Sequence, residues 1–175
     1  IPDPYHPGEE FIYKGWKALG LVDVRRAIAW SSDIFFYTVG GGFKNQKGLG
    51  IDRLEYWYKQ FGLGSKTGIE LSGEASGRIP NPAWKQETFN EPWYLGDTYF
   101  TAIGQYSVQT TPVQMARAIA AVANDGKLLT PTLLADQVPN FVMVPADPEA
   151  LAVVRQGMRQ GVTSALASAI NLSYL

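Results

Sequence analysis

The sequence contains no cysteine and only one histidine, His6, among its 175 residues. The missing cysteine excludes a thiolate nucleophile and a cysteine-ligated zinc site, and the single histidine argues against a histidine-rich metal centre. No apolar run approaches the roughly 18 residues that a membrane-spanning helix needs. An excess of one charge is also missing, since 15 basic and 16 acidic residues are mixed along the chain. A nucleic-acid-binding surface is therefore not indicated.

The bulk composition indicates a globular protein with a sizeable core. Hydrophobic residues make up 46% of the chain and charged residues 18%, and a chain of ~150 residues buries roughly 70% of its unfolded surface. The sequence begins at Ile1 without an initiator methionine or a signal peptide, and it ends at Leu175 directly after a helix-like run. We expect both ends to be cut points within a longer protein.

Two short helices are predicted in the first quarter of the chain, after a loop over residues 1–20. Asp23 is a suitable N-cap for a helix over Val24–Trp30. A second helix is expected over Ile34–Val39, because three consecutive glycines follow it.

The clearest helical pattern starts at Asp52, which is expected to form a capping box with Glu55. The apolar residues along this helix follow the i, i+3, i+4, i+7 spacing of one face, and they are Leu54, Trp57, Tyr58 and Phe61. Gly62 should end the helix. The stretch from there to about residue 97 is predicted to be loop, because prolines prevent long regular structure. These prolines are Pro80, Pro82 and Pro92.

Two further helices are predicted in the second half. Thr111 and Gln114 should form a capping box around Pro112. The apolar stripe expected to be buried in that helix comprises Val113, Ala116, Ile119, Ala120 and Ala123. A last helix should begin at Asp147 and end near Gly161, and its inward residues are expected to be Leu151, Val154 and Met158. Few strands are indicated. The pattern predicts a mixed α/β fold in which this chain forms a mostly helical lobe, attached to a sheet that other sequence supplies.

The segment Ser31-Ser32-Asp33 places two hydroxyls and one carboxylate at the break between two apolar helical runs. Side chains at such a break can face a cleft. Taken alone, however, a serine or aspartate before an apolar run is typical of a helix cap. The local sequence therefore leaves a structural and a catalytic interpretation open.

A series of short blocks extends from Val24 to Gly126 around this segment. They are Val24–Ile28, Ser31–Tyr37, Gly50–Leu54, Phe61–Gly64, Thr67–Leu71, Gly73-Glu74, Gly77–Pro80, Trp84-Lys85, Trp93-Tyr94, Gly96–Thr98, Ile103–Gln105, Thr111–Met115 and Asn124–Gly126. Each block alone is a weak signal, but their order and spacing together are specific. The chain resembles the transpeptidase domain of class B penicillin-binding proteins, and most nearly the elongation type.

The resemblance implies a D,D-transpeptidase that cross-links peptidoglycan stem peptides through a serine acyl-enzyme and is acylated by β-lactams. It also implies the serine transpeptidase fold shared with β-lactamases, in which a sheet covered by helices lies next to a helical lobe. Three motifs make that active site: Ser-x-x-Lys with the nucleophile, Ser-x-Asn opposite it, and Lys-Ser/Thr-Gly on a strand.

Ser31-Ser32-Asp33 stands in the position of the middle motif. By the resemblance, Ser31 is the hydroxyl that passes protons between the two motif lysines. Asp33 replaces the usual asparagine: its carboxylate can pair with the lysine of the nucleophile motif, but it cannot donate a hydrogen bond to substrate. Ser32 is expected to fill the middle position with its side chain turned away from the site. Ser31 and Asp33 are therefore the candidate catalytic residues.

The other two motifs are missing from residues 1–175. No serine has a lysine three residues later, so the nucleophile is expected upstream of Ile1 and the third motif beyond Leu175. Lys66-Thr67-Gly68 has the letters of the third motif, but it follows a glycine-rich turn without a buried strand, and we interpret it as a non-catalytic loop. The chain is thus expected to be part of a transpeptidase domain, inactive by itself.

No cofactor or metal is expected. Some relatives hold zinc near this region through aspartate, histidine and cysteine, but Ala18-Leu19-Gly20 stands where they have Gly-His-Gly. The resemblance further implies a polytopic membrane glycosyltransferase of the elongation machinery as a partner. It implies an N-terminal membrane anchor outside this chain, with the catalytic domain on the periplasmic side of the cytoplasmic membrane.

Three other interpretations stay open. The 5 tryptophans and 9 tyrosines could form a glycan- or partner-binding module, with Trp84 and Trp93 as its platform. The protein could instead be a degenerate, scaffold-only relative, or a division-type class B transpeptidase, although Asp33 argues against the division type. Tyr106 replaces the second glycine of the Gly-Gln-Gly sequence that the family usually has, and we expect altered loop geometry there.

Overall fold

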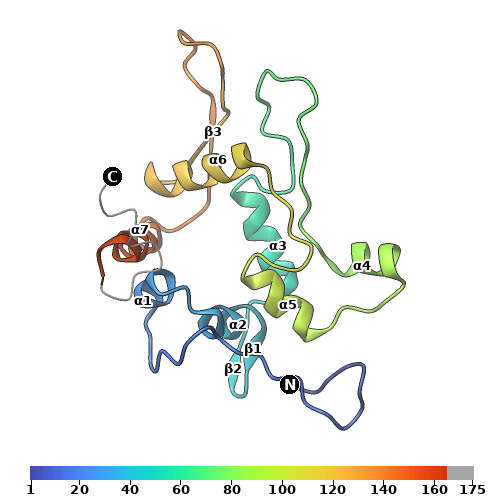
Figure 1. Cartoon of the computed structure of the whole chain (residues 1–175). Coiled ribbons are helices and arrows are strands. Elements are labelled where there is room, and N and C mark those ends of the chain that lie inside the picture. Colours follow the sequence, from blue (N-terminus) through green and yellow to red (C-terminus); the bar gives the residue numbers. More distant parts are fainter. Residues whose placement is uncertain (165–175) are drawn as a thin grey trace.

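The computed structural model describes residues 1–164. The bounds of its elements are α1 Val24–Ala29, α2 Asp33–Gly41, β1 Gly42–Phe43, β2 Gln46–Lys47, α3 Ile51–Gln60, α4 Pro82–Phe89, α5 Leu95–Ala102, α6 Pro112–Ala123, β3 Lys127–Leu129, β4 Phe141–Met143 and α7 Pro148–Thr163. The strands form two antiparallel hairpins, with Gly42 opposite Lys47 and Leu128 opposite Val142. The predicted mixed but mostly helical architecture is confirmed (Figure 1). None of the helices in this range is long and apolar enough to cross a membrane.

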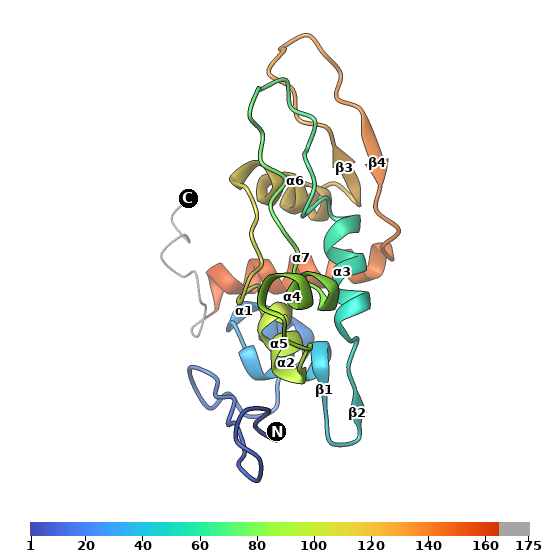
Figure 2. The same cartoon turned by 90° about the vertical axis from the view of Figure 1, so that its right-hand side faces the viewer.

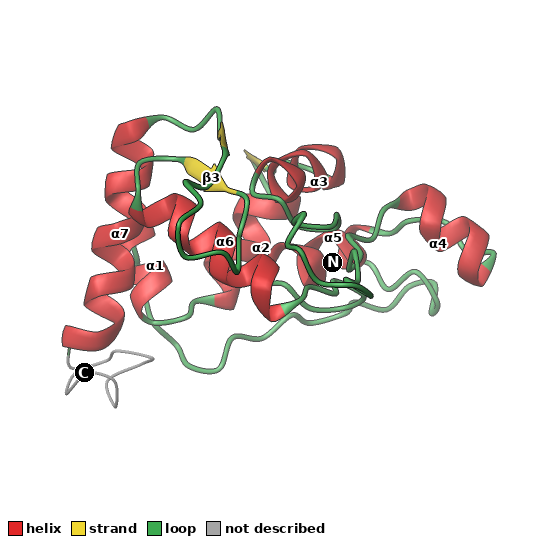
Figure 3. Cartoon of the chain, turned by 90° about the horizontal axis from the view of Figure 1, so that it is seen from above, coloured by secondary structure: helices red, strands yellow, loops and turns green. Residues whose placement is uncertain are grey.

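Two helix pairs form the frame around the α1–α2 junction: α1 packs on α7, and α2 packs on α5. Figure 3 shows α1 beside α7 at one end of the molecule and α4 at the other. Gly157 lets the first pair approach closely, because a Cβ there would lie 3.0 Å from the Cβ of Ile28. Gly40 serves the second pair, since an added methyl group would overlap Ala102 of α5. Small residues thus set both helix crossings.

The remaining core lies where α3, α6 and the β3–β4 hairpin meet. Its buried apolar side chains form two clusters, one of Leu63, Ile79 and Ala118 and the other of Ala121, Leu128 and Val144. Two long loops, at 62–81 and 130–140, project from this end (Figures 1 and 2). They are joined by Glu70, which accepts hydrogen bonds from the hydroxyl of Thr132 (2.7 Å) and the backbone N–H of Leu133 (3.1 Å).

The loop at the N-terminus is anchored by an aromatic cluster. The ring of Tyr13 lies 5.5 Å from that of Tyr37 in α2 and 5.0 Å from that of Tyr99 in α5, both in edge-to-face geometry. Burial raises the pKa of the Tyr13 phenol to about 12. The first part of the chain is thereby held across the α2–α5 pair.

Three of the predicted helix starts are confirmed. Asp23 accepts a hydrogen bond from the backbone N–H of Arg26 (2.9 Å), the Thr111–Gln114 capping box is present, and Asp147 caps α7. The helix predicted over Ile34–Val39 is observed slightly longer, as α2.

The capping box predicted at Asp52 and Glu55 is wrong. α3 begins directly after Gly50 without a side-chain cap. Glu55 instead accepts hydrogen bonds from Lys59 (2.6 Å) and Asn81 (2.9 Å), and it thereby ties the helix to a distant loop. The Glu55 carboxylate therefore binds Asn81, which is distant in sequence, and does not cap its own helix.

The loop predicted between residues 62 and 97 contains a helix, α4, that the proline count obscured. Asn81 caps it by accepting a hydrogen bond from the N–H of Trp84 (2.9 Å), and Pro82 occupies the first helical position. A proline is favourable there because that N–H has no partner within the helix.

The buried stripe predicted for α6 is also wrong. The residues it buries are Gln114, Ala118 and Ala121, whereas Ala116, Ile119 and Ala123 are exposed. Gln114 sets this orientation: its side-chain amide is fully buried and donates to the backbone carbonyls of Ser65 and Ser76. A polar anchor therefore turns the helix away from the face that its apolar pattern favoured. In α7, Leu151 is buried as predicted, but Met158 is exposed.

Gly40→Ala should lower the free energy of unfolding by about 1–3 kcal/mol, because the new methyl group overlaps Ala102 in a close helix crossing. Adding Ala102→Gly should recover most of that loss, since it removes the overlapping methyl group. Urea unfolding of the two variants and the parent protein measures both effects. An unchanged unfolding midpoint for Gly40→Ala would show that the close approach is not required.

Candidate active site

The Ser31–Asp33 segment joins α1 to α2 by two successive caps. The backbone N–H of Ser32 donates to the carbonyl of Ala27 (2.9 Å), and that of Ser31 donates to Ile28 (3.3 Å). These two bonds are the pair of a Schellman motif, which ends a helix with one residue in the left-handed region. That residue is Ser31, at φ 51°. Glycine is usual in such a position, and a residue with a Cβ costs about 1–2 kcal/mol there.

Ser32 is the N-cap of α2. Its side-chain oxygen accepts from the N–H of Phe35 (3.4 Å), and only 5% of the residue is exposed. The cap predicted for this segment is therefore supplied by Ser32 and not by Asp33. Asp33 is the first residue of α2, where the positive end of the helix dipole favours a carboxylate.

The two candidate catalytic side chains are not engaged by other described groups. Ser31 is exposed and Asp33 is half-buried, and within residues 1–164 neither side chain makes a hydrogen bond. Asp33 is close enough to Tyr37, one turn later, to act on it: burial raises the pKa of that phenol, and the Asp33 charge raises it further. The junction thus carries a hydroxyl and a carboxylate two positions apart, at the end of α1 and the start of α2.

An apolar groove lies beside this junction. It has a volume of about 510 Å³ and is lined by α1, α2, α3, α6 and α7. All its lining residues are apolar or aromatic, namely Ile28, Phe36, Leu54, Trp57, Tyr58, Phe61, Leu63, Ala118, Ile119, Val122, Leu151, Val154 and Met158. Ile119 and Met158 are among the exposed large side chains of the molecule. Of the stripe predicted to be buried in α6, only Ile119 lines this groove, together with Ala118 and Val122 of the same helix.

Lys66-Thr67-Gly68 lies in a loop, as predicted, and not on a strand. The side chain of Glu74 accepts hydrogen bonds from the hydroxyl and N–H of Thr67 and from the N–H of Gly68. The hydrogen bond from the Thr67 hydroxyl is the main reason that the pKa of Glu74 is lowered. These contacts close the loop between Thr67 and Glu74, and they give the Lys66-Thr67-Gly68 segment a structural role.

A family model described as the penicillin binding protein transpeptidase domain matches residues 2–172. The chain belongs to this family. The resemblance read from the sequence blocks is confirmed.

Several relatives of this transpeptidase domain are similar over most of the chain. The peptidoglycan D,D-transpeptidase MrdA of Escherichia coli strain K12 is 41% identical over 141 residues, which are 79% of this chain and 21% of that protein. A complex between PBP2 and MreC from Helicobacter pylori gives a TM-score of 0.81 at 29% identity, over 98% of this chain and 32% of that one. A structure described as "Structural coordination of polymerization and crosslinking by a peptidoglycan synthase complex" gives 0.73 at 33% identity, over 87% and 26%. The chain thus spans about a fifth of the length of the curated relative.

The zinc site of some transpeptidase domains does not fit the residues of this one. The full sequence has no cysteine, and its only histidine, His6, lies in an exposed loop against Asp3 (3.1 Å). Residues 1–164 contain no group of three or more histidine, aspartate or glutamate side chains arranged to hold a metal. No chemical step is assigned to zinc.

The proposed glycan platform is occupied by internal contacts. The indole N–H of Trp93 donates to the hydroxyl of Thr98 (2.8 Å), and the guanidinium of Arg78 lies 4.7 Å from the ring centre of Trp84. Tyr106 lies edge-on to both tryptophans, with its backbone at φ 65°. Tyr106 therefore adopts a left-handed backbone, which glycine adopts without cost, and its ring joins this cluster.

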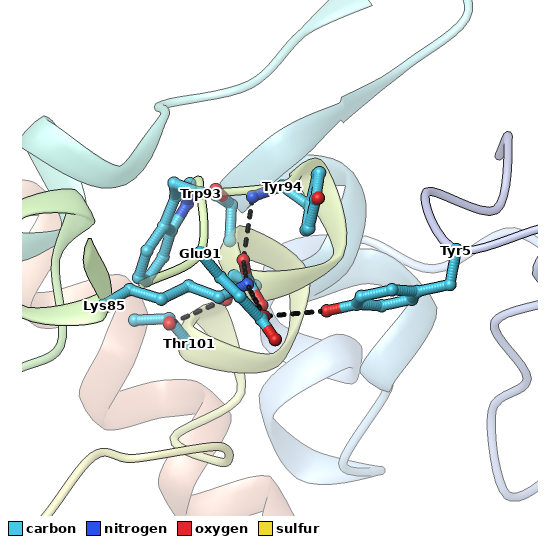
Figure 4. Close-up of polar contacts among 8 residues, drawn as sticks. Tyr5, Lys85, Glu91, Trp93, Tyr94 and Thr101 are labelled. Carbon is cyan, nitrogen blue, oxygen red and sulfur yellow. Dashed lines mark hydrogen bonds and ion pairs between the residues drawn. The ribbon is translucent and has the colours of Figure 1, made fainter. Parts of the chain in front are cut away.

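Sequence reasoning did not find the buried ion pair of this transpeptidase domain. Lys85 of α4 is only 2% exposed, and its ammonium lies 2.7 Å from the carboxylate of Asp97 in α5 (Figure 4). Glu91 lies 3.6 Å away on the other side and accepts a hydrogen bond from the Tyr5 hydroxyl. Asp97 also accepts from the backbone N–H of Tyr94, which closes the first turn of α5. The sequence does contain the start signal of α4, since Asn81 is a favourable cap and Pro82 a favourable first residue. Recognising that helix would have placed Lys85 on a helix and not in a loop.

The charge of Lys85 is stabilised by its partner. Burial alone lowers the pKa of the ammonium, but the hydrogen bond and the charge of Asp97 together raise it above the ordinary 10.5. The stabilisation is therefore complete below pH 10.5 and is lost as the pH rises through the higher folded-state pKa.

Lys85→Met should lower the free energy of unfolding by about 3–5 kcal/mol, because it leaves a carboxylate unpaired in the interior. The double variant Lys85→Met/Asp97→Asn should recover part of the loss, since no charge is left unpaired and the asparagine oxygen can still accept from Tyr94. Urea unfolding at neutral pH measures both. Lys59→Met is the control: it breaks the exposed 2.6 Å pair with Glu55 and should cost about 0.2–1 kcal/mol. Equal losses for the single and double variants would contradict this account.

Proposed function

We propose that the chain is part of a peptidoglycan D,D-transpeptidase of the elongation type, in which Ser31 and Asp33 act in catalysis. The observation that carries the proposal is the pair of uncommitted side chains at the α1–α2 junction, in a chain of this family. The 41% identity to MrdA of Escherichia coli supports the elongation type over the division type.

In the proposed reaction, a serine upstream of this chain attacks the carbonyl carbon between the two terminal D-alanines of a stem peptide. The bond to the last D-alanine breaks, and that residue leaves as an amine after receiving a proton. The amine of a second stem peptide then attacks the serine ester, which forms the cross-link and returns the serine. The Ser31 hydroxyl relays the proton in both steps, since it can accept and donate at the same oxygen.

Asp33 has a complementary task in this proposal. A carboxylate at the start of α2 can pair with the lysine of the nucleophile motif, so that the ammonium is held close to Ser31. The side chain is half-buried and bound to no other group within residues 1–164, so it is available for such a pair.

The groove beside the junction supports the view that the rest of the domain is supplied by other sequence. The lining of this groove is apolar throughout. Ile28 and Phe36 bring it next to the Ser31–Asp33 segment. We propose that the segments carrying the Ser-x-x-Lys motif and the sheet pack here.

The cellular setting is proposed from the relatives. The Helicobacter pylori PBP2 was solved in complex with MreC, and another similar structure belongs to a peptidoglycan synthase complex. We propose peptidoglycan stem peptides as substrate, β-lactams as acylating ligands, and a membrane glycosyltransferase as partner, with the domain tethered to the periplasmic face of the cytoplasmic membrane. A scaffold-only relative is the alternative, and a gene without an upstream Ser-x-x-Lys would favour it.

The full-length protein should be labelled covalently by a fluorescent penicillin, whereas the isolated 175-residue chain should not, because it lacks the nucleophile. Ser31→Ala in the full-length protein should slow acylation by about 10²- to 10⁴-fold, the usual contribution of a proton-transfer group. Gel fluorescence after timed labelling measures the rate.

Ser72→Ala is the matched control for that experiment. Ser72 is exposed in a turn far along the chain from the motif, so its loss should leave the acylation rate unchanged. Stoichiometric labelling of the isolated chain would overturn the proposal, as would a full-length Ser31→Ala variant that is acylated at the parent rate.

A further inference from the structure

The strained backbone at Ser31 is held by a side chain from outside the motif. The indole N–H of Trp16 donates to the carbonyl oxygen of Trp30 (2.9 Å) and to that of Ser31 (3.0 Å). These two carbonyls belong to the peptide groups on either side of the Ser31 Cα. A donor shared between them therefore restrains both φ and ψ of that one residue.

The restraint matters because Ser31 does not favour this conformation. Its φ of 51° lies in the region that glycine adopts freely and other residues adopt at a cost. Strain of this kind persists only where the surroundings over-determine it, and it is concentrated at functional sites. The caps at Ser31 and Ser32 fix the helix ends, and Trp16 adds the contact that fixes the residue between them.

The indole ring of Trp16 contributes little to the hydrophobic core. Trp16 is 57% exposed, so burial of the ring contributes only a small part of the core. The neighbouring Gly15 packs against α2, where a Cβ would lie 3.2 Å from the Cγ1 of Ile34. The loop is thus seated by Gly15 on the first turn of α2, and its tryptophan points the N–H at the junction.

We propose that Trp16 is a positioning residue of the transpeptidase, which holds the Ser31 hydroxyl in its reactive direction by restraining the backbone beneath it. The inference rests on the proposed function of Ser31. In this inference Trp16 acts only through Ser31.

The test compares Trp16→Phe with Trp93→Phe in the full-length protein. Both substitutions keep an aromatic ring and remove one indole donor, but Trp93 lies in the loop before α5 and donates to Thr98 of that helix. Hydrogen exchange followed by mass spectrometry reports on the backbone at residues 30–33, and timed labelling with a fluorescent penicillin reports on acylation. A second pair of proteins, Ser31→Ala with and without Trp16→Phe, shows whether the effect passes through Ser31.

We expect Trp16→Phe to speed exchange at residues 30–33 and to slow acylation by roughly 3- to 10-fold, the worth of one or two hydrogen bonds. Trp93→Phe should do neither. In the Ser31→Ala background, Trp16→Phe should slow acylation no further.

The possible failures are distinguishable. Unchanged exchange at residues 30–33 in Trp16→Phe overturns the inference whether or not the protein binds penicillin. Faster exchange with unchanged acylation, or an additive loss in the Ser31→Ala background, also overturns the positioning role. If the parent protein is not labelled at all, the proposed function fails and the positioning role fails with it, while the exchange data still show whether Trp16 restrains the junction.

Discussion

The left-handed backbone at Ser31 is the constraint on which the arrangement of this chain depends. One residue ends α1 by a Schellman motif, and the next residue begins α2 as its N-cap. The direction of each helix is therefore fixed within three residues. Because α1 packs on α7 and α2 packs on α5, the same junction also fixes which parts of the chain the two helices bring together. The backbone that carries the Ser31 hydroxyl and the Asp33 carboxylate is thereby fixed by hydrogen bonds on both sides of the junction.

Buried polar side chains decide much of the remaining structure. Gln114 binds two loop carbonyls and so sets the face that α6 turns to the core. Lys85 and Asp97 join α4 to α5 by a charge pair out of solvent. Such groups are costly to bury without partners and have few acceptable positions, so each one specifies a single packing more narrowly than an apolar contact does. In this chain they hold long loops that contain little regular structure.

The apolar groove and the uncommitted site side chains have a common explanation. Both lie where α1 and α2 meet, and both are surfaces that a complete domain would cover or complete. The chain spans about a fifth of the length of MrdA from Escherichia coli. In the proposed function, this structure is one wall of the active site and the face that receives the other walls.

The sequence by itself determined the family, the helical character, the caps at Asp23, Thr111 and Asp147, and the segment that presents Ser31 and Asp33. These features depend on local hydrogen bonding or on motif order, both of which a linear pattern records. Tertiary structure alone decided which face α6 buries, that Glu55 binds Asn81, and that Lys85 pairs with Asp97. Those outcomes depend on partners distant in sequence, and a buried polar contact can outweigh the apolar periodicity from which a helix face is predicted. The support that Trp16 gives to Ser31 belongs to the same class, because Trp16 precedes Ser31 by fifteen positions, with α1 between them, and only the fold brings the indole to the junction.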